Sequence, residues 1–338
     1  MRGAVLYAPG DVRVEDRDDP AVTKPTDAVI RLSATCVCGS DLWPYRGINP
    51  IDEPTPMGHE YCGIVEEVGR EVSTIRPGQF VVGSFIASDN TCPHCRAGFH
   101  TSCAQREGVS GAQAERMRVP LADGTLVATP DVPDDDLVPS LLSASDVLGT
   151  GWFAAVAARV QPGHTVAVVG DGAVGLLGVL SAARMGAARI IAMSRHEPRQ
   201  KLALDFGATD IVIERGDDGV ARIRDLTDGV GADAVLECVG TGEAMSQAVR
   251  STRPGGHVGF VGVPHGVSLD GGLLFRSVVG VQGGPAPVRR FLPELVDLIL
   301  RRQIDPGRVF DLVLPLDEVA EGYRAMDERR AIKSLLRP

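Results

Sequence analysis

The sequence predicts an α/β protein in which a doubly wound parallel sheet follows a separate β-rich domain. Two observations carry this prediction. Short β-rich runs divided by Pro, Gly and Asp clusters fill the chain to about residue 145, and strand-like and helix-like runs alternate from Thr165 onward. Alternation predicts βαβ units around a parallel sheet, whereas short strands between turn residues predict a small barrel or sandwich. A chain of 338 residues is long enough for two such domains.

The first part of the chain has the pattern of an irregular β domain. Its clearest strand candidates are Ala28–Leu32, Gly63–Val68 and Phe80–Ile86. Turn-forming clusters such as Asn49-Pro50 and Arg76-Pro77-Gly78 interrupt them. This spacing favours a barrel or sandwich over a parallel sheet.

The second part predicts the parallel sheet. Its expected strands are Val166–Val169, Arg189–Met193, Asp210–Ile213, Ala234–Cys238, Val258–Val261 and Val278–Gln282. Helical runs such as Val174–Met185 and Glu243–Thr252 fall between them, and a helix beginning near Val147 is expected to join the two domains. Two further helices are expected over Val288–Arg301 and Asp317–Arg329. We therefore place the domains at residues 1–147 and 148–285, with a segment 286–338 returning to the first domain.

Composition excludes several classes of protein. Hydrophobic residues make up 44% and charged residues 23%, as in ordinary globular proteins. A net charge of −10 argues against nucleic acid as a partner, because a phosphate backbone requires a basic surface. No apolar leader or run of 18 apolar residues is present, so we expect a cytoplasmic protein without membrane insertion. Seven cysteines, three of them crowded into one loop, favour metal ligation over disulfides.

A glycine motif predicts a dinucleotide site. Gly170-Asp171-Gly172-Ala173-Val174-Gly175 lies between an expected strand and an expected helix, where the first βα turn of such a fold belongs. Gly170 would form the tight turn, Gly172 would let a pyrophosphate approach the backbone, and Gly175 would allow close packing. The helix N-terminus beginning at Ala173 and Val174 would bind the phosphates.

The end of the second expected strand indicates which cofactor binds. A site for NAD usually has a carboxylate there for the ribose hydroxyls. Here Ser194 stands at that position and is followed by Arg195, His196 and, further on, Arg199. Arginine binds phosphate through paired charge-assisted hydrogen bonds, so this run favours NADP(H) over NAD(H). Glu197 is the competing carboxylate, and we expect it to cap the next helix instead.

Cys38, His59 and a later carboxylate form a ligand set suited to zinc. Cys36 would share the face of Cys38 on a strand, so spacing alone leaves the choice between the two open. Cys38-Gly39-Ser40-Asp41, Gly58-His59-Glu60, the cysteine loop and the glycine motif, taken in this order, resemble the zinc-dependent medium-chain alcohol dehydrogenase family. The resemblance covers essentially the whole chain. It implies a co-chaperonin-like β-barrel catalytic domain and a Rossmann domain.

The resemblance also implies roles at a catalytic zinc. Cys38, His59 and Asp146 would be ligands, although many members have cysteine where Asp146 stands. Glu60 would be a neighbouring carboxylate able to enter the coordination sphere, and Asp41 would hold His59 by a hydrogen bond. Ser40 matches the hydroxyl that contacts the substrate oxygen. Many members have a histidine where Trp43 follows, which leaves the onward proton path open. A lone Asp146 would otherwise be a helix cap.

The family's structural zinc is held by four cysteines, and the matching positions here are Asp89, Cys92, Cys95 and Cys103. Aspartate can ligate zinc, so this set is chemically sound. A fourth ligand from His94 or His100, or a loop of reduced cysteines without metal, remain alternatives. Cys62 and Cys238 are expected to be small buried hydrophobes.

The resemblance further places Thr150 against the nicotinamide, and the segments Cys238-Val239-Gly240 and Val261-Gly262-Val263 along the same half of the cofactor. Trp43, Tyr45, Phe85 and Trp152 could line an apolar substrate pocket, although Trp152 fits the core equally well. The expected function is hydride transfer between NADP(H) and a small-to-medium alcohol, aldehyde or ketone. A polyol or sugar dehydrogenase, a zinc-free quinone or enoyl reductase, and a non-catalytic NADPH-binding protein are the alternatives. The family forms homodimers and homotetramers, and the sequence does not choose between them.

Overall fold

The computed structural model describes all 338 residues and divides into two compact units. Unit 1 comprises Met1–Asp146 and Pro287–Pro338, and unit 2 comprises Val147–Ala286. The C-terminal segment therefore packs with the first part of the chain. None of the helices is long and apolar enough to cross a membrane.

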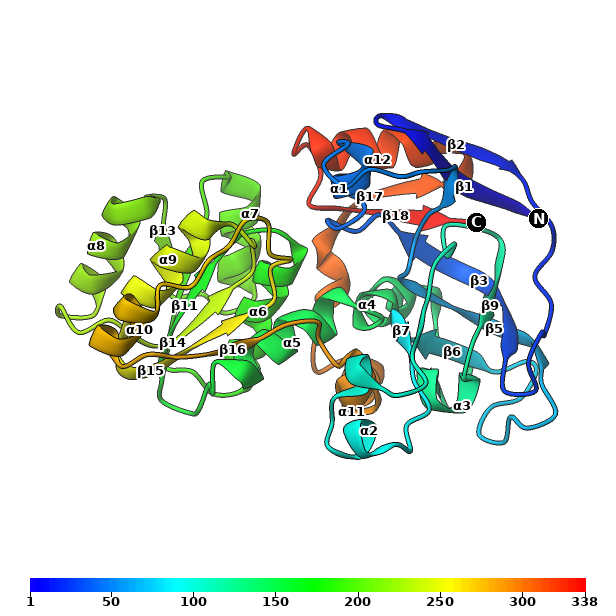
Figure 1. Ribbon diagram of the computed structural model, residues 1–338, viewed down its shortest axis with the longest axis horizontal. Helices are drawn as coiled ribbons and strands as arrows, with labels where there is room; N and C mark the ends of the chain where they lie inside the picture. The colour runs from blue at the N-terminus through cyan, green and yellow to red at the C-terminus, as the bar shows by residue number, and fades with distance from the viewer. The chain divides into compact units, whose positions relative to one another are not determined.

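Unit 1 contains most of the strands, in two larger sheets and one small ribbon (Figure 1). Its strands are β1 (Arg2–Ala8), β2 (Asp11–Asp16), β3 (Ala28–Cys36), β4 (Thr55–Pro56), β5 (Tyr61–Val68), β6 (Phe80–Gly83), β7 (Ile86–Ala87), β8 (Glu107–Gly108), β9 (Arg116–Val119), β10 (Leu126–Ala128), β17 (Phe310–Pro315) and β18 (Lys333–Arg337). Its α-helices are α1 (Leu42–Tyr45), α2 (Pro93–Arg96), α3 (Ala122–Thr125), α4 (Val138–Ala144), α11 (Val288–Leu300) and α12 (Val319–Asp327). Short 3₁₀ turns cover His100–Ser102, Asp135–Leu137, Pro306–Val309 and Leu316–Glu318.

The main sheet of unit 1 runs in the order β10-β6-β5-β3-β18-β17, and β9 also pairs with β3. Strand β3 is central because it pairs with β5, β9 and the C-terminal strand β18, all antiparallel. One hydrophobic core, built largely from β3, β5, β6 and β9, includes Ile30, Tyr61 and Met117, all nearly inaccessible to solvent. The pairing of β18 with β3 thus brings the C-terminal strand next to a strand from the first part of the chain.

Unit 2 is a six-stranded, all-parallel sheet in the order β13-β12-β11-β14-β15-β16. Its elements are α5 (Val147–Ala157), β11 (Thr165–Val169), α6 (Ala173–Arg184), β12 (Arg189–Met193), α7 (Glu197–Asp205), β13 (Asp210–Val212), α8 (Gly216–Leu226), β14 (Ala232–Glu237), α9 (Gly242–Ser251), β15 (Thr252–Phe260), α10 (Gly271–Ser277) and β16 (Gly280–Gly283). The strand order reverses between β11 and β14, which is the doubly wound arrangement of a dinucleotide-binding domain.

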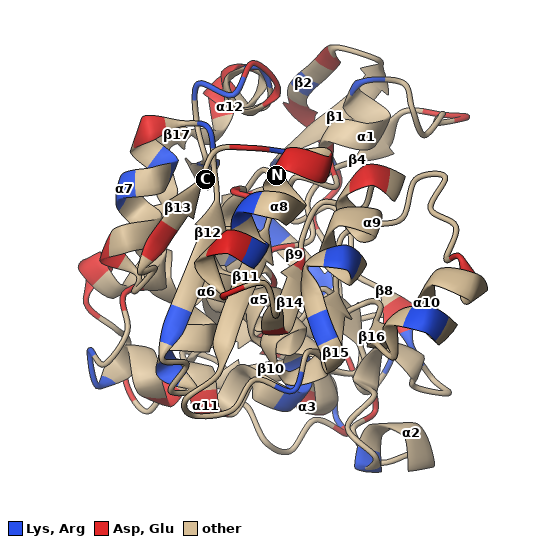
Figure 2. Ribbon diagram, turned by 90° about the vertical axis from the view of Figure 1, so that its left-hand side faces the viewer, with Lys and Arg blue, Asp and Glu red and all other residues tan.

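Helices cover both faces of this sheet (Figure 1). Its strands are almost continuously apolar and buried, because a parallel sheet covered on both faces has no solvent side. On the side of the molecule shown in Figure 2, basic and acidic residues are interspersed rather than gathered in a single basic stripe. Because the strand order reverses between β11 and β14, the carboxyl ends of these strands are where a dinucleotide site is expected.

Several expected elements differ from the structure in their bounds. Strand β3 continues to Cys36 rather than Leu32, and β15 begins at Thr252 rather than Val258. Two further differences have local reasons. The run Phe80–Ile86 forms two strands, because the carbonyl of Gly83 accepts a hydrogen bond from Ser145 and that of Ser84 accepts one from Tyr61. The last strand of the parallel sheet begins at Gly280 rather than Val278, since Val278 takes a left-handed conformation at the end of α10.

Candidate active site and metal centres

Four potential metal ligands meet at one end of the main sheet of unit 1. Cys38 follows β3 by two residues, and His59 and Glu60 directly precede β5. The antiparallel pairing of Thr35 with Tyr61 brings these two segments together. Asp146 lies two residues after the end of α4, and its neighbour Ser145 accepts a hydrogen bond from the Tyr61 N–H at 3.0 Å.

The ligand atoms of Cys38, His59, Glu60 and Asp146 all lie within 4.8 Å of one another. We call this group the Cys38 centre. The Asp146 carboxylate lies 3.3 Å from Nε2 of His59 and 3.8 Å from Sγ of Cys38. Cys36 is not part of the group, so the geometry selects Cys38 where spacing alone could not. One thiol, one imidazole and two carboxylates form a donor set that suits zinc.

Asp41 orients the histidine of this centre. Its Oδ1 lies 3.4 Å from Nδ1 of His59, on the opposite side of the ring from Asp146. Its Oδ2 accepts hydrogen bonds from the Cys38 N–H at 3.0 Å and from Nε2 of Gln113 at 3.1 Å. Gln113 is in turn fixed by the Tyr323 hydroxyl at 3.1 Å. A carboxylate on Nδ1 leaves Nε2 free to bind a metal, as in many zinc sites.

Glu60 is held by a fully buried lysine from the C-terminal strand. Nζ of Lys333 donates to Oε1 of Glu60 at 2.6 Å and to the Val37 carbonyl at 3.1 Å. The other carboxylate oxygen, Oε2, is buried and has no hydrogen-bond partner. A buried carboxylate oxygen without a partner is costly unless a ligand satisfies it. This orphaned oxygen therefore fits a cation at the Cys38 centre.

The protonation of these groups in the metal-free protein follows from burial and charge. Burial raises the pKa of the Cys38 thiol, because it penalises the thiolate. Burial also raises the pKa of Glu60, although Lys333 opposes it. For His59 burial acts to lower the pKa, but Asp41 and Cys38 outweigh it and leave the pKa well above its ordinary value. A metal ion would have to displace these protons, so its binding depends on pH.

A second group forms within one loop of unit 1. The ligand atoms of Asp89, Cys92, Cys95 and Cys103 also lie within 4.8 Å of one another, and we call this group the Cys92 centre. Sγ of Cys92 lies 3.6 Å from Sγ of Cys95 and 3.9 Å from that of Cys103. His100 is not part of the group, since its Nε2 is bonded to Oδ1 of Asn90 at 2.8 Å.

Backbone N–H groups hold the ligands of the Cys92 centre. Oδ1 of Asp89 accepts from the N–H groups of Thr91 at 2.8 Å and Cys92 at 3.0 Å. Sγ of Cys103 accepts from the N–H groups of Asp89 and Gln105, both at 3.3 Å. Burial acts to raise the pKa of Asp89, but these N–H bonds and the neighbouring thiols lower it to about 2. Asp89 is thus a carboxylate at neutral pH and could ligate a cation together with the three cysteine sulfurs.

The glycine motif lies at the first βα turn of unit 2, between β11 and α6. Gly170 has a φ of +117°, which favours glycine, and a side chain at Gly175 would lie 2.1 Å from the Gly170 carbonyl oxygen. Gly172 is the N-cap of α6 and has open space on its Cβ side. A ligand can therefore approach the first N–H groups of α6, at Ala173 and Val174, and this arrangement fits a pyrophosphate.

Ser194 ends the second strand of the parallel sheet and is connected to this motif. Its hydroxyl donates to Oδ2 of Asp171 at 2.7 Å, and Nη1 of Arg199 lies 3.4 Å from Oδ1 of the same aspartate. The Arg195 side chain is exposed and donates to the Ile213 carbonyl. His196, not Glu197, is the N-cap of α7, so the expected capping role of Glu197 is wrong. Glu197 begins the helix, where a negative charge is favourable.

Two segments at the carboxyl ends of β14 and β15 lie side by side. A side chain at Gly240 would lie 2.1 Å from the Val263 carbonyl oxygen, so these backbones are in close contact. Val239 and Val263 are exposed, at 39% and 50%, and provide apolar surface at the cofactor edge of the sheet. Cys238, expected to be buried, is only half-buried, and Val261 lies beside it at the same edge. Thr150, on α5, is buried.

The aromatic residues expected around the substrate are distributed unevenly. The ring of Phe85 packs edge-on against His59, with centroids 6.2 Å apart, so it lies beside the Cys38 centre. Trp43 and Tyr45 both lie on α1 and are half-buried. Trp152 is buried, as its core interpretation expected.

Four buried or half-buried polar residues at these sites were missed by reasoning from the sequence. Lys333 and Gln113 support the Cys38 centre, and no local pattern marks either, because their partners lie far away in the sequence. Asp171 could have been noticed, since it stands inside the glycine motif. Glu237 is buried and accepts from the N–H groups of Val239 at 2.9 Å and Gly240 at 2.8 Å, which fixes the turn after β14.

A GroES-like unit with a cysteine–histidine–carboxylate group and a doubly wound nucleotide-binding unit define a class of metal-dependent dehydrogenases. Residues 24–131 match the family described as alcohol dehydrogenase GroES-like domain, and residues 173–300 match zinc-binding dehydrogenase. The chain belongs to the zinc-dependent medium-chain alcohol dehydrogenase family.

Individual relatives match this chain over most or nearly all of their own length. A probable zinc-binding alcohol dehydrogenase of Mycobacterium tuberculosis is 37% identical over 100% of this chain and 89% of its own. The NADP-dependent isopropanol dehydrogenase of Thermoanaerobacter brockii is 30% identical over 100% of this chain and 99% of its own. Among solved structures, alcohol dehydrogenase TADH from Thermus sp. ATN1 has a TM-score of 0.91 and 32% identity, covering 100% of this chain and 99% of that one.

Proposed function

We propose that this protein transfers a hydride between NADP(H) and a small-to-medium alcohol or its aldehyde or ketone, with zinc at the Cys38 centre. The observation that carries the proposal is the convergence of four ligand atoms within 4.8 Å, together with the orphaned buried oxygen of Glu60. A zinc-free reductase of the same fold has no need for such a group. The residues that would hold the zinc are Cys38, His59 and Asp146.

The zinc would supply Lewis acidity, which lowers the pKa of an alcohol hydroxyl or polarises a carbonyl. The protein's own residues would keep the centre in shape. Asp41 orients His59, and Lys333 holds Glu60 at one oxygen while leaving the other available. Ser40, half-buried beside Asp41, offers a hydroxyl that would accept a hydrogen bond from the substrate hydroxyl. Phe85 provides an apolar wall next to His59, which favours an uncharged substrate.

The cofactor preference rests on the end of β12. Ser194 carries no charge to repel a 2′-phosphate, and Arg195 is exposed beside it. Arg199 is half-buried and pairs with Asp171, the same aspartate that accepts the Ser194 hydroxyl. The relative from Thermoanaerobacter brockii is described as NADP-dependent, which agrees with this choice. Asp171 opposes a preference for NADP(H), because its carboxylate lies next to Ser194 and would repel the 2′-phosphate. Arg199, which pairs with Asp171, would offset this repulsion.

Metal content and cofactor kinetics together test the proposal. Purified protein should contain zinc, and Cys38→Ser should lose one equivalent together with activity on primary and secondary alcohols. With NADP(H), kcat/KM should exceed that with NAD(H), and Arg195→Ala should reduce the preference by about tenfold, because one charge-assisted bond is lost. Arg222→Ala, an exposed arginine on α8, is the matched control. Activity that survives complete zinc removal would instead support a zinc-free quinone or enoyl reductase.

A further inference from the structure

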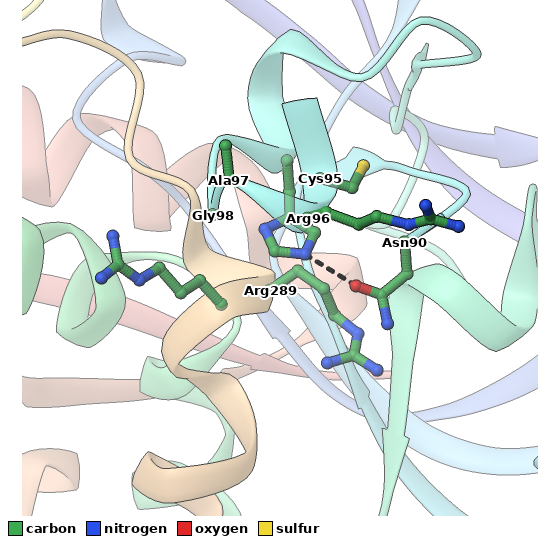
Figure 3. Close-up of a pocket in the computed structure, with 8 residues that line it drawn as sticks. Asn90, Cys95, Arg96, Ala97, Gly98 and Arg289 are labelled. Atoms are coloured by element: carbon green, nitrogen blue, oxygen red, sulfur yellow. Dashed lines mark hydrogen bonds between the residues drawn. The ribbon is translucent and has the colours of Figure 1, made fainter. Parts of the chain in front are cut away.

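A cavity of about 350 Å³ opens beside the Cys92 centre and is lined by basic residues (Figure 3). Arg96 and His100 come from the cysteine loop, and Arg289 and Arg290 come from the start of α11. None of the lining residues is acidic. The cavity thus joins two segments of unit 1 that lie far apart in the sequence, and it carries a strong positive charge in a protein whose net charge is −10.

The three guanidinium groups of this cavity form no ion pair within the protein. Arg96 is exposed at the end of α2, and Arg290 lies against Gly98 and over the Phe291 ring, 5.1 Å from its centroid. Nε of Arg289 is buried without a hydrogen-bond partner, and burial lowers the pKa of its guanidinium. Arginines elsewhere in unit 1, such as Arg2 and Arg118, are paired with carboxylates. What distinguishes this cluster is that three arginines without a carboxylate partner line the same cavity.

Helix α11 makes this arrangement more costly. Arg289 and Arg290 stand in its first turn, where the positive end of the helix dipole disfavours cations. The N-cap residue, Pro287, provides no side-chain acceptor, and the first turn contains no acidic residue. Arg289, Arg290 and Arg96 all line this one cavity, and no acidic side chain balances their charge there. Local features that conflict with stability in this way usually mark a functional site.

From this geometry we infer that the cavity binds a tetrahedral oxyanion of the phosphate type, either free or as a phosphate ester. Arginine suits such a ligand, because its planar fork donates two parallel hydrogen bonds to adjacent oxygens. The volume exceeds that of a single phosphate, so a small esterified group can be accommodated as well. Bound oxyanion would connect α11 to the loop that carries Cys92, Cys95 and Cys103, and would stabilise that loop. The inference does not depend on the proposed catalytic function.

The arginines could instead serve only to offset negative charge at the Cys92 centre, where zinc with three thiolates and a carboxylate would be net negative. The two roles give different results. An oxyanion site binds phosphate saturably with the metal in place. A purely compensating role changes metal retention on substitution but gives no specific phosphate binding.

The test uses the zinc-loaded full chain without cofactor. Inorganic phosphate and glycerol phosphate are titrated separately, by calorimetry and by melting temperature, against sodium chloride at matched ionic strength. Saturable binding and a saturable rise in melting temperature are expected. Arg289→Gln should weaken phosphate binding by about tenfold or more, since a charge-assisted pair is lost. Arg96→Gln should weaken phosphate binding also. Because Arg96 is exposed, this variant keeps the test valid if Arg289→Gln misfolds.

Two controls locate the binding. Arg301→Gln, at the other end of α11 and paired with Asp297, should bind phosphate like the native protein. Arg195→Ala tests whether phosphate occupies the cofactor site instead. The inference is overturned if neither ligand binds saturably. It is also overturned if Arg195→Ala abolishes binding while Arg289→Gln and Arg96→Gln do not, or if the last two alter only metal content. Tighter binding of glycerol phosphate identifies an ester as the ligand, and equal binding identifies free phosphate.

Discussion

The two candidate metal centres of unit 1 differ in how their ligands are held. At the Cys38 centre, side chains hold the ligands: Asp41 contacts His59, and Lys333 contacts Glu60. At the Cys92 centre, backbone N–H groups hold Asp89 and Cys103. The first centre mixes nitrogen, oxygen and sulfur and includes one carboxylate oxygen without a partner. The second is dominated by sulfur.

This difference would suit the Cys38 centre to ligand exchange and the Cys92 centre to structural stability. Cys38, His59 and Asp146 as ligands, with the Glu60 carboxylate nearby, would allow a bound zinc ion to exchange a ligand, as catalytic zinc sites require. Three thiolates and a carboxylate from one short loop would close the coordination sphere of a bound zinc ion. The two centres also differ in where their ligands lie in the sequence. The Cys38 centre forms only after three distant segments have folded together, whereas all ligands of the Cys92 centre lie within residues 89–103. Substitutions in the two centres should therefore fail in different ways.

The largest effect is expected at the Cys38 centre. Cys38→Ser should lower kcat/KM for alcohol oxidation by at least about a thousandfold, because transition-state charge stabilisation of several kcal/mol is lost with the metal. Cys36→Ser is the matched control, since Cys36 is buried two residues away but outside the ligand group. Circular dichroism should show that both variants keep the native fold. Equal loss of activity in the two variants would contradict the assignment of Cys38.

At the Cys92 centre the expected effect is on stability. Cys92→Ser should lose one zinc and lower the melting temperature by roughly 5–10 °C, which corresponds to about 2–4 kcal/mol of lost binding energy. At 25 °C its kcat/KM should stay within about tenfold of the native value, because the Cys38 centre is untouched. Metal analysis and calorimetry on the same preparation check this prediction. A loss of activity as large as that of Cys38→Ser would remove the distinction between the centres.

The supporting carboxylate should give a smaller effect than a ligand. Asp41→Asn keeps the shape of the side chain but weakens the contact with Nδ1 of His59, so kcat/KM or zinc affinity should fall by about 10–100-fold. Ser73→Ala, at an exposed position outside both ligand groups, is a suitable control. Unchanged zinc affinity and unchanged kinetics in Asp41→Asn would show that Asp41 does not orient the histidine.

The same contrast explains what the sequence could predict. The strand–glycine–helix pattern predicts the parallel sheet and its first turn, because local periodicity and glycine placement determine both. The ligands of the Cys92 centre are close in the sequence, so their spacing alone indicates a metal loop. The choice of Cys38 over Cys36 needed either the family motif or the structure, since alternate residues of a strand share one face.

Contacts across long sequence separations could not be predicted. Lys333 reaches Glu60 only because β18 pairs with β3, and no pattern near residue 333 indicates that pairing. The Asp171–Ser194 contact likewise depends on the neighbouring positions of β11 and β12 in the sheet. The division of Phe80–Ile86 into two strands follows from hydrogen bonds to Ser145 and Tyr61. Tertiary partners decided each of these features.

The smallest predicted effect concerns acid. As the pH falls, zinc should be released at a higher pH than the pH at which unit 1 unfolds. Asp27 is fully buried, and its Oδ2 accepts from Nε of Arg118 at 2.6 Å and the Lys24 N–H at 2.8 Å. Burial acts to raise the pKa of Asp27, but these partners outweigh it and lower the pKa below its ordinary value. The contribution to stability is therefore complete above the unfolded pKa of about 3.9, and is lost as pH falls through the lower folded value.

Zinc-bound thiolates compete with protons at higher pH than this carboxylate does. Native protein should therefore release zinc from the Cys92 centre above about pH 4 while its circular dichroism is still native. Asp27→Asn removes the charged partner of Arg118, so it should cost about 1–2 kcal/mol at neutral pH and raise the midpoint of acid unfolding toward that of zinc release. Glu71→Gln, on the exposed surface of the same unit, should leave both midpoints unchanged. If zinc release and unfolding coincide in the native protein, the Cys92 centre holds unit 1 together more firmly than its short loop implies.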